Sequence, residues 1–262
     1  MPGPPDFLLI GAPKCGTSAL HRALNRHPDL FLTEPKEPKF FLTDGPPPIS
    51  GGGPGDVETW AEHVWRRADY EKLFEAAPPG ARRGESTVFY LYDTAAQRRI
   101  RELVPAAKLI AVLRDPVERA HSNWAHLRGA GLEPEADFGA ALRAEPRRIE
   151  QGWAHFWHYT AQGRYGEQLA HLDTLFAPEQ VLLIRYRDLR DAPGETIDRV
   201  CRFLGVATGV VAGVPRHNVR PDVHGRTAGP TPAERAEALP RFADDVPRVA
   251  GRTGWDLADW LR

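Results

Sequence analysis

Lys14 lies inside a short loop that begins at Gly11 and ends at Gly16, and two hydroxyl residues, Thr17 and Ser18, follow the loop. Backbone N–H groups at the start of a helix, together with an ammonium group, bind phosphate well. The spacing Gly11-x4-Gly16 matches the first half of a nucleotide-binding P-loop, but Thr17 stands where that motif has its lysine. The loop therefore predicts a phosphate-like ligand held by Lys14 and the first turn of a helix.

A carboxylate cluster follows in the segment 34–41, where glutamates alternate with lysines before two phenylalanines. A carboxylate can take the proton from an attacking hydroxyl group. Glu34 and Glu37 are both candidates for such a base. Lys39 is a candidate contact to the acceptor. The other interpretation of the segment is a solvated charge cluster beside two core aromatic residues.

A third candidate group begins at Arg114, directly after the apolar run 109–113. Asp115 and Pro116 are typical of the start of a helix, and this helix carries Ser122. A guanidinium fork and a hydroxyl group are suited to binding phosphate. The alternative is that Arg114 only pairs with the helix-capping aspartate.

Buried strands must position these residues. Apolar runs at 7–10, 109–113 and 181–184 predict strands, and amphipathic segments that follow them predict helices. Ligands of open α/β sheets bind at the carboxyl ends of parallel strands, which is where the candidate residues of the first and third groups lie. We therefore predict an α/β fold of three layers with a central, mostly parallel sheet and a P-loop-like first strand–loop–helix unit.

Three motifs resemble one known family. PKCGTSAL at 13–20 is similar to the 5′-phosphosulfate loop of sulfotransferases that use 3′-phosphoadenosine-5′-phosphosulfate (PAPS). EPKFF at 37–41 resembles the E-x-x-F-F segment of the Golgi heparan-sulfate-type sulfotransferases and their bacterial relatives. RDPVERAHSNW at 114–124 is similar to the 3′-phosphate motif of the family. The likeness extends over nearly the whole chain and indicates a bacterial relative of those enzymes.

The resemblance implies an enzyme that moves a sulfuryl group from PAPS, by in-line transfer, to a hydroxyl group of a small molecule, natural product, glycan or glycolipid. The product of the donor is adenosine 3′,5′-bisphosphate, and no metal is implied. By this resemblance we predict Glu37 as the general base and keep Glu34 as the alternative, and Lys14 stabilises charge on the leaving group. The expected donor-binding residues are Lys14, Cys15, Gly16, Thr17, Ser18, Arg114, Ser122 and Arg226.

Acceptor binding is less defined by the sequence. Ser86 stands where polysaccharide-modifying members have a lysine, which disfavours a polyanionic acceptor. Trp153 and Trp157 either wall an acceptor pocket or cover the sheet. With Lys39, these residues are the candidate acceptor contacts.

Two irregular segments accompany the site. The Gly- and Pro-rich segment 45–55 predicts a flexible loop, either a substrate gate or a surface insertion. The basic segment 216–228 is expected to cover the nucleotide.

Length and composition limit the classes of protein to which the chain can belong. The 262 residues are expected to form one domain, 1–262, and a net charge of −1 argues against non-specific nucleic-acid binding. No apolar run has the length of a membrane span, which leads us to expect a cytoplasmic protein. The composition hints at a bacterium and at natural product biosynthesis. The histidines lack metal-ligand spacing, so no metal is expected.

Two other functions are compatible with parts of the sequence. A P-loop nucleotide kinase or NTPase would turn over ATP with Mg²⁺, but it needs a lysine directly after Gly16. A non-catalytic nucleotide-binding protein would keep the phosphate contacts and would not need Glu37. The sequence gives no indication of the oligomeric state.

Overall fold

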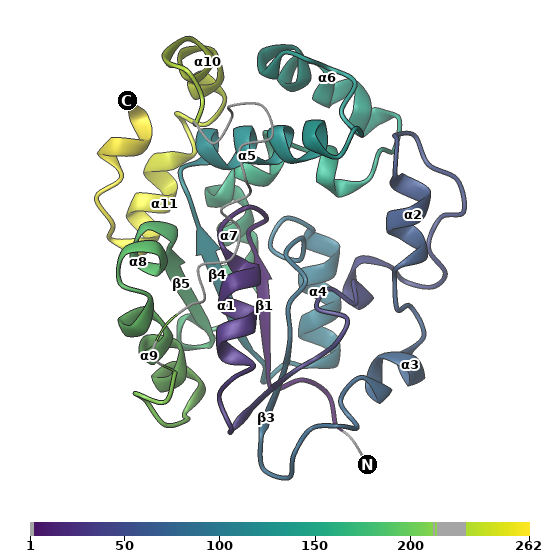
Figure 1. Ribbon diagram of the computed structural model, residues 1–262, viewed down its shortest axis with the longest axis vertical. Coiled ribbons are helices and arrows are strands. Elements are labelled where there is room, and N and C mark those ends of the chain that lie inside the picture. Colours follow the sequence, from purple (N-terminus) through teal and green to yellow (C-terminus); the bar gives the residue numbers. More distant parts are fainter. Residues whose placement is uncertain (1–2, 212, 214–228) are drawn as a thin grey trace. The chain divides into compact units, whose positions relative to one another are not determined.

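One parallel sheet organises the fold. The computed structural model describes residues 3–211, 213 and 229–262, and within them five strands pair in the order β2-β3-β1-β4-β5 (Figure 1). All neighbouring strands run parallel, as the sequence predicts. The strands are β1 (Phe7–Gly11), β2 (Leu30–Leu32), β3 (Arg82–Glu85), β4 (Lys108–Leu113) and β5 (Val181–Arg185).

β1 is the central strand, and every one of its residues is buried. It pairs with β3 on one side and with β4 on the other, so Phe7 is level with Gly84 and with Lys108. A Cβ atom at Gly84 would collide with the ring of Phe7, so glycine lets the two strands approach. Because the strand order changes direction beside β1, the carboxyl end of β1 is the switch point where open α/β sheets bind ligands.

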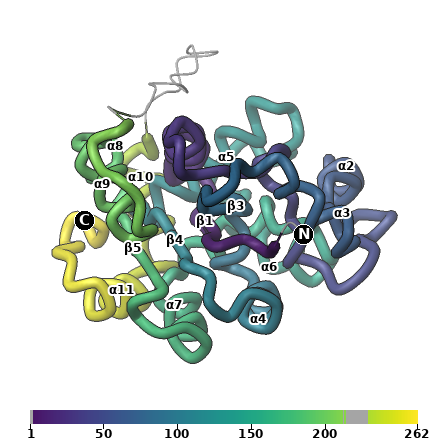
Figure 2. The backbone as a smooth tube through the Cα atoms, turned by 90° about the horizontal axis from the view of Figure 1, so that it is seen from below, coloured from purple at the N-terminus to yellow at the C-terminus, as the bar shows by residue number. Residues whose placement is uncertain are grey.

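Two compact units divide the chain, and the sheet belongs to the first, which comprises residues up to 47, 62–113 and 171–211. In Figure 2, α1, α8 and α9 lie on one side of the sheet, and α4 lies on the other. The end of α7 adjoins α4, where His171 Nδ1 lies 2.7 Å from Gln97 Oε1. The helices of this unit are α1 (Thr17–Leu24), α3 (Arg67–Lys72), α4 (Thr94–Leu103), α8 (Tyr186–Asp191) and α9 (Pro193–Leu204). α7 (Tyr165–Asp173) belongs to this unit only from His171 onward.

The second unit is helical and comprises residues 48–61, 114–170 and 229–262 of the described chain. Its core holds a fully buried arginine, Arg119, which donates to Gln162 Oε1 at 3.1 Å and to the carbonyl of Tyr159. The helices are α2 (Asp56–Ala61), α5 (Pro116–Gly129), α6 (Phe138–Glu150), α10 (Pro232–Ala238) and α11 (Val246–Thr253).

No helix of the described chain combines the length and the apolar character that crossing a bilayer requires. The expectation of a single domain over 1–262 stays a prediction beside the division into two units. Each unit is therefore described by itself below.

Candidate active site

The loop after β1 leads directly into α1. Gly16 is the N-cap of α1 and has a φ of 81°, in the left-handed region that glycine adopts without strain. A Cβ atom there would also lie 3.1 Å from the ring of Tyr186 in α8. Within the described residues, no side chain caps α1, and its first turn holds no acidic residue. The N–H groups of this turn are thus directed to a site without a competing carboxylate of their own helix, as an anion requires.

The side chains of the loop differ in exposure. Lys14 is half-buried and has a φ of 66°, and Ser18 is also half-buried. Thr17 is 4% exposed. The Cys15 thiol is fully buried and donates to the carbonyl of Pro13 at 3.5 Å, so Cys15 offers its backbone rather than its side chain.

His21, one turn further along α1, ties this helix to the end of β3. Its Nδ1 lies 2.8 Å from the hydroxyl oxygen of Ser86, and its Nε2 lies 3.9 Å from Glu34 Oε1. Burial, together with the nearby cations Lys36 and Arg22, lowers the pKa of His21 to about 4. The ring is therefore neutral at pH 7. Ser86 is fully buried, so its side chain is not exposed to an acceptor. Its expected contact with an acceptor stays a prediction.

The carboxylates of the segment 34–41 have different surroundings. Glu37 Oε1 accepts a hydrogen bond from Lys36 Nζ at 2.6 Å, and 27% of the Glu37 side chain is exposed. Glu34 is 77% exposed. Lys39 is buried, and its Nζ lies 2.5 Å from Glu62 Oε2. Glu37 is thus the more enclosed carboxylate and has an ammonium partner, which favours it over Glu34 as the candidate base.

A buried carboxylate that the sequence did not single out lies beside this segment. Glu85, the last residue of β3, accepts hydrogen bonds from Tyr70 Oη at 3.1 Å, Tyr90 Oη at 2.8 Å and Thr87 Oγ1 at 2.8 Å. Burial raises the pKa of Glu85 to about 7, the three hydroxyl donors oppose this rise, and the charge of Glu37 adds to it. A carboxyl group with this pKa changes its charge near neutral pH.

The pKa of Glu85 leads to an expected pH dependence of stability. Between pH 4.5 and 7 the folded chain retains a proton on Glu85 that the unfolded chain has lost, so the free energy of unfolding falls as the pH rises through this range. The whole effect is about 3 kcal/mol. Urea unfolding at pH 5 and pH 8 measures it, with Glu85→Gln as the variant that cannot titrate. We expect wild type to lose about 2 to 3 kcal/mol relative to the variant between the two pH values; equal losses would contradict the shift.

The 3′-phosphate candidates belong to the second unit. Arg114 donates from Nε to Glu118 Oε2 at 3.0 Å, and 20% of its side chain is exposed. Asp115 caps α5, as predicted, by accepting from the N–H groups of the following turn, and it also binds Arg235 at 2.6 Å. Ser122 is half-buried on α5. Arg114, which precedes α5, thus has a carboxylate partner in the first turn of that helix, and a phosphate would replace or join this partner.

The predicted aromatic acceptor residues pack around an ion pair. Arg148 makes a two-point contact with Glu133, at 2.8 and 2.7 Å, and its guanidinium lies 4.9 Å from the ring centre of Trp153 and 5.1 Å from that of Trp157. Trp157 is fully buried and donates to Asp56 at 2.8 Å, whereas Trp153 is half-buried. Their role in acceptor binding stays a prediction, and Trp153 is the one with an accessible ring.

The structure describes only one of the two expected loops, the segment 45–55. In the segment 45–55, Gly52 and Gly53 lie against Trp153 so closely that a Cβ atom on either would collide with the indole. Gly53 also donates its N–H to Asp56 at 2.8 Å. The flexibility of the segment stays a prediction. Arg226 and the remainder of the segment 216–228 lie outside the described residues.

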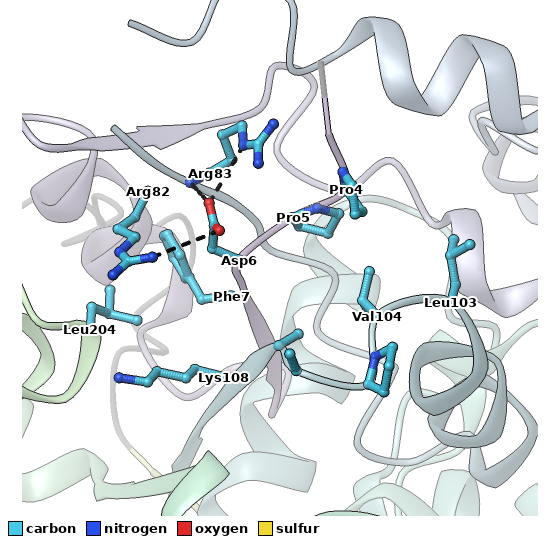
Figure 3. Close-up of a pocket in the computed structure, with 13 residues that line it drawn as sticks. Pro4, Pro5, Asp6, Phe7, Arg82, Arg83, Leu103, Val104, Lys108 and Leu204 are labelled. Carbon is cyan, nitrogen blue, oxygen red and sulfur yellow. Dashed lines mark hydrogen bonds and ion pairs between the residues drawn. The ribbon is translucent and has the colours of Figure 1, made fainter. Parts of the chain in front are cut away.

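A cavity of the first unit lies at the opposite end of the sheet. It has a volume of about 370 Å³ and is lined where β1, β3 and β4 begin (Figure 3). Asp6 points between Arg82 and Arg83 there, at 4.0 and 3.5 Å. None of the candidate catalytic residues lines this cavity, which is at the amino ends of the strands rather than at the ligand-binding ends.

A parallel sheet whose central strand ends in a lysine-bearing loop and an uncapped helix defines an α/β protein of the P-loop-like class. Residues 89–219, half of the chain, match the sulfotransferase domain family. The crystal structure of a sulfotransferase from Alicyclobacillus acidocaldarius is 32% identical, with a TM-score of 0.87 over 99% of this chain and 100% of that one. The chain belongs to the sulfotransferase family.

Two further proteins are similar to about three quarters of this chain. Human bifunctional heparan sulfate N-deacetylase/N-sulfotransferase 3 is 30% identical over 77% of this chain, which spans only 22% of the human protein. A mouse sulfotransferase, SULT7A1, crystallised in complex with PAP, is 17% identical, with a TM-score of 0.51 over 78% of this chain and 60% of that one. The mouse structure shows the same fold.

Proposed function

We propose that the chain transfers a sulfuryl group from PAPS to a hydroxyl group. The observation that carries the proposal is the uncapped start of α1 with Lys14 in the loop before it, because N–H groups and an ammonium suit the 5′-phosphosulfate of this donor. The PAP named in the mouse structure is the 3′,5′-bisphosphate that PAPS leaves behind, and the proposal carries this donor over.

In the proposed reaction, Glu37 takes the proton of the acceptor hydroxyl as its oxygen attacks sulfur. The new O–S bond forms while the bond from sulfur to the 5′-phosphate oxygen breaks, and the electron pair goes to that phosphate. Lys14 and the N–H groups of residues 16–18 stabilise the charge that develops there. The ammonium and the N–H groups supply the stabilisation of negative charge that the transfer requires, so we propose that the reaction proceeds without a metal.

The 3′-phosphate of the donor is assigned to Arg114 and Ser122, on the strength of the sequence resemblance and of the partly exposed guanidinium. Arg226 is retained as a further phosphate contact. Thr17 and Cys15 contribute to the phosphosulfate loop, Cys15 through its backbone.

We propose a small or amphiphilic acceptor, such as a natural product or a glycolipid, modified in the cytoplasm of a bacterium. The human relative is named as an N-sulfotransferase, so an amine is the rival acceptor. Ser86 carries no positive charge for a polyanion, and Lys39 already binds Glu62, which favours an acceptor of low charge.

Incubation with sulfur-labelled PAPS and a panel of acceptors tests the function. The panel contains matched alcohol and amine pairs, such as a hexoside and its 2-amino-2-deoxy counterpart. We expect labelled product and an equal amount of adenosine 3′,5′-bisphosphate with an alcohol, unchanged by EDTA. Transfer that stops with EDTA would contradict the metal-free mechanism, and labelling of the amines alone would contradict the hydroxyl acceptor.

Replacement of Arg114 by alanine is expected to weaken binding of adenosine 3′,5′-bisphosphate about 10- to 100-fold, the size of one charge-assisted phosphate contact. Binding of AMP, which lacks the 3′-phosphate, should change less than about 2-fold, since it loses no such contact. Titration calorimetry with both ligands measures the difference. Arg67→Ala is the matched control, because it also removes an Arg–Glu pair of spacing i, i+4. Equal losses for the two ligands would remove Arg114 from the 3′-phosphate site.

A further inference from the structure

Three hydroxyl groups converge on Glu85, and two of them also touch the segment that carries Glu37. Thr87 Oγ1 accepts the N–H of Lys39 at 3.2 Å, and Tyr90 Oη accepts the N–H of Phe41 at 3.2 Å. Both hydroxyls donate their own protons to Glu85. Glu85 and these donors are all buried in the first unit.

The direction of each hydrogen bond follows from the number of protons. A hydroxyl group has one proton, and an ionised carboxylate has none, so the hydroxyls of Thr87 and Tyr90 must donate to Glu85. Their lone pairs then remain for the N–H groups of Lys39 and Phe41. A protonated or amide group at position 85 would supply a donor of its own and remove this constraint.

One residue of the segment 36–41 has an unusual backbone conformation that its surroundings must hold. Lys39 has a φ of 59°, in the left-handed region that residues other than glycine seldom adopt unless their surroundings hold them there. A third anchor is the N–H of Ser86, which donates to the carbonyl of Lys36 at 3.2 Å. Glu37 lies between the anchored residues 36 and 39.

We propose that Glu85 is a positioning residue, which as a carboxylate orients the hydroxyls of Thr87 and Tyr90 and through them fixes residues 36–41 in the geometry that Glu37 needs. The catalytic part of this inference rests on the proposed function, whereas the anchoring of the segment does not. The groups that face Glu85 are Tyr70, Tyr90 and Thr87, with Glu37 as the charged neighbour. Burial holds the pKa of Glu85 near 7, so the anchoring carboxylate prevails above neutral pH.

Four variants separate anchoring from general packing. Thr87→Val and Tyr90→Phe each remove one hydroxyl that accepts from the segment. Thr87→Ser keeps that hydroxyl and should rescue. Tyr70→Phe is the matched control: its hydroxyl also donates to Glu85, but within the described residues no N–H of the segment 36–41 is bonded to it.

Hydrogen–deuterium exchange of peptides covering 36–41 tests anchoring without any assay of activity. We expect exchange at least about 5-fold faster in Thr87→Val and Tyr90→Phe, the effect of losing one hydrogen bond. Wild type should show the same acceleration at pH 6 relative to pH 8, after correction for intrinsic exchange. Thr87→Ser and Tyr70→Phe should stay within about 2-fold of wild type, since each keeps both anchors. Unchanged exchange in both test variants would overturn the proposal.

Turnover of PAPS tests the catalytic part. We expect kcat to fall about 5- to 10-fold in Thr87→Val and Tyr90→Phe, with the affinity for adenosine 3′,5′-bisphosphate kept. In wild type kcat should rise with pH through about 7, and Glu85→Gln should lack this rise. Faster exchange with unchanged kcat would overturn the catalytic role of the anchors. A wild-type protein inactive with PAPS would instead contradict the proposed function, while the exchange measurement still decides the anchoring.

Discussion

Replacement of Glu37 by glutamine is expected to lower kcat about 100-fold or more, which is the size of a general-base contribution. The amide keeps the shape of the side chain but cannot take the proton of the acceptor hydroxyl. Affinity for PAPS should be unchanged, because the phosphate contacts are assigned to other residues. Initial rates with saturating PAPS and acceptor, together with a nucleotide titration, measure both quantities.

Glu34→Gln is the matched control for this variant. Glu34 lies in the same segment, but its side chain is 77% exposed, against 27% for Glu37. We expect Glu34→Gln to keep its activity within about 2-fold, as surface substitutions usually do. Near-normal activity of Glu37→Gln together with an inactive Glu34→Gln would transfer the role of base to Glu34. Normal activity of both would remove this segment from the chemistry.

Replacement of Lys14 by alanine is expected to lower kcat about 100- to 1,000-fold, the usual effect of removing one group that stabilises charge in a transition state. The ammonium is assigned to the oxygen atoms on which charge develops as the sulfur–oxygen bond breaks. Its loss should therefore affect kcat more strongly than the binding of the uncleaved donor. Single-turnover rates with labelled PAPS separate the two effects.

Lys72→Ala provides the comparison for Lys14→Ala. Lys72 is an exposed lysine of α3 that pairs with Asp69 at 3.1 Å, so its removal changes the net charge equally without touching the phosphate loop. We expect no change in kcat beyond about 2-fold. A loss of donor affinity that accounts for the whole effect of Lys14→Ala would show that Lys14 binds the donor without assisting bond cleavage.

The parts of the fold that depend on local pattern could be predicted from the sequence. The apolar runs 7–10 and 109–113 are the cores of β1 and β4, because a strand covered on both faces is apolar throughout. Asp115 and Pro116 start α5 for reasons confined to the first turn of that helix. The lysine-bearing loop is likewise a contiguous motif, and the structure places it at the switch point of the sheet.

The network around Glu85 could not be predicted in this way. Its hydrogen bonds join Lys39 to Thr87 and Phe41 to Tyr90, pairs that lie 48 and 49 residues apart in the chain. A local pattern contains no information about such partners. The available signal was a carboxylate at the end of a short strand, followed within five residues by Thr87 and Tyr90, whose hydroxyls can satisfy it.

The identity of the donor is tested most directly by calorimetric titration of the wild-type protein with adenosine 3′,5′-bisphosphate in EDTA and with ATP in Mg²⁺. Our prediction is that the bisphosphate binds without a metal and at least about 10-fold more tightly than ATP, since only the bisphosphate offers a 3′-phosphate for a charge-assisted contact. Tighter binding of ATP, dependent on Mg²⁺, would contradict it and would point to a nucleotide kinase or NTPase instead.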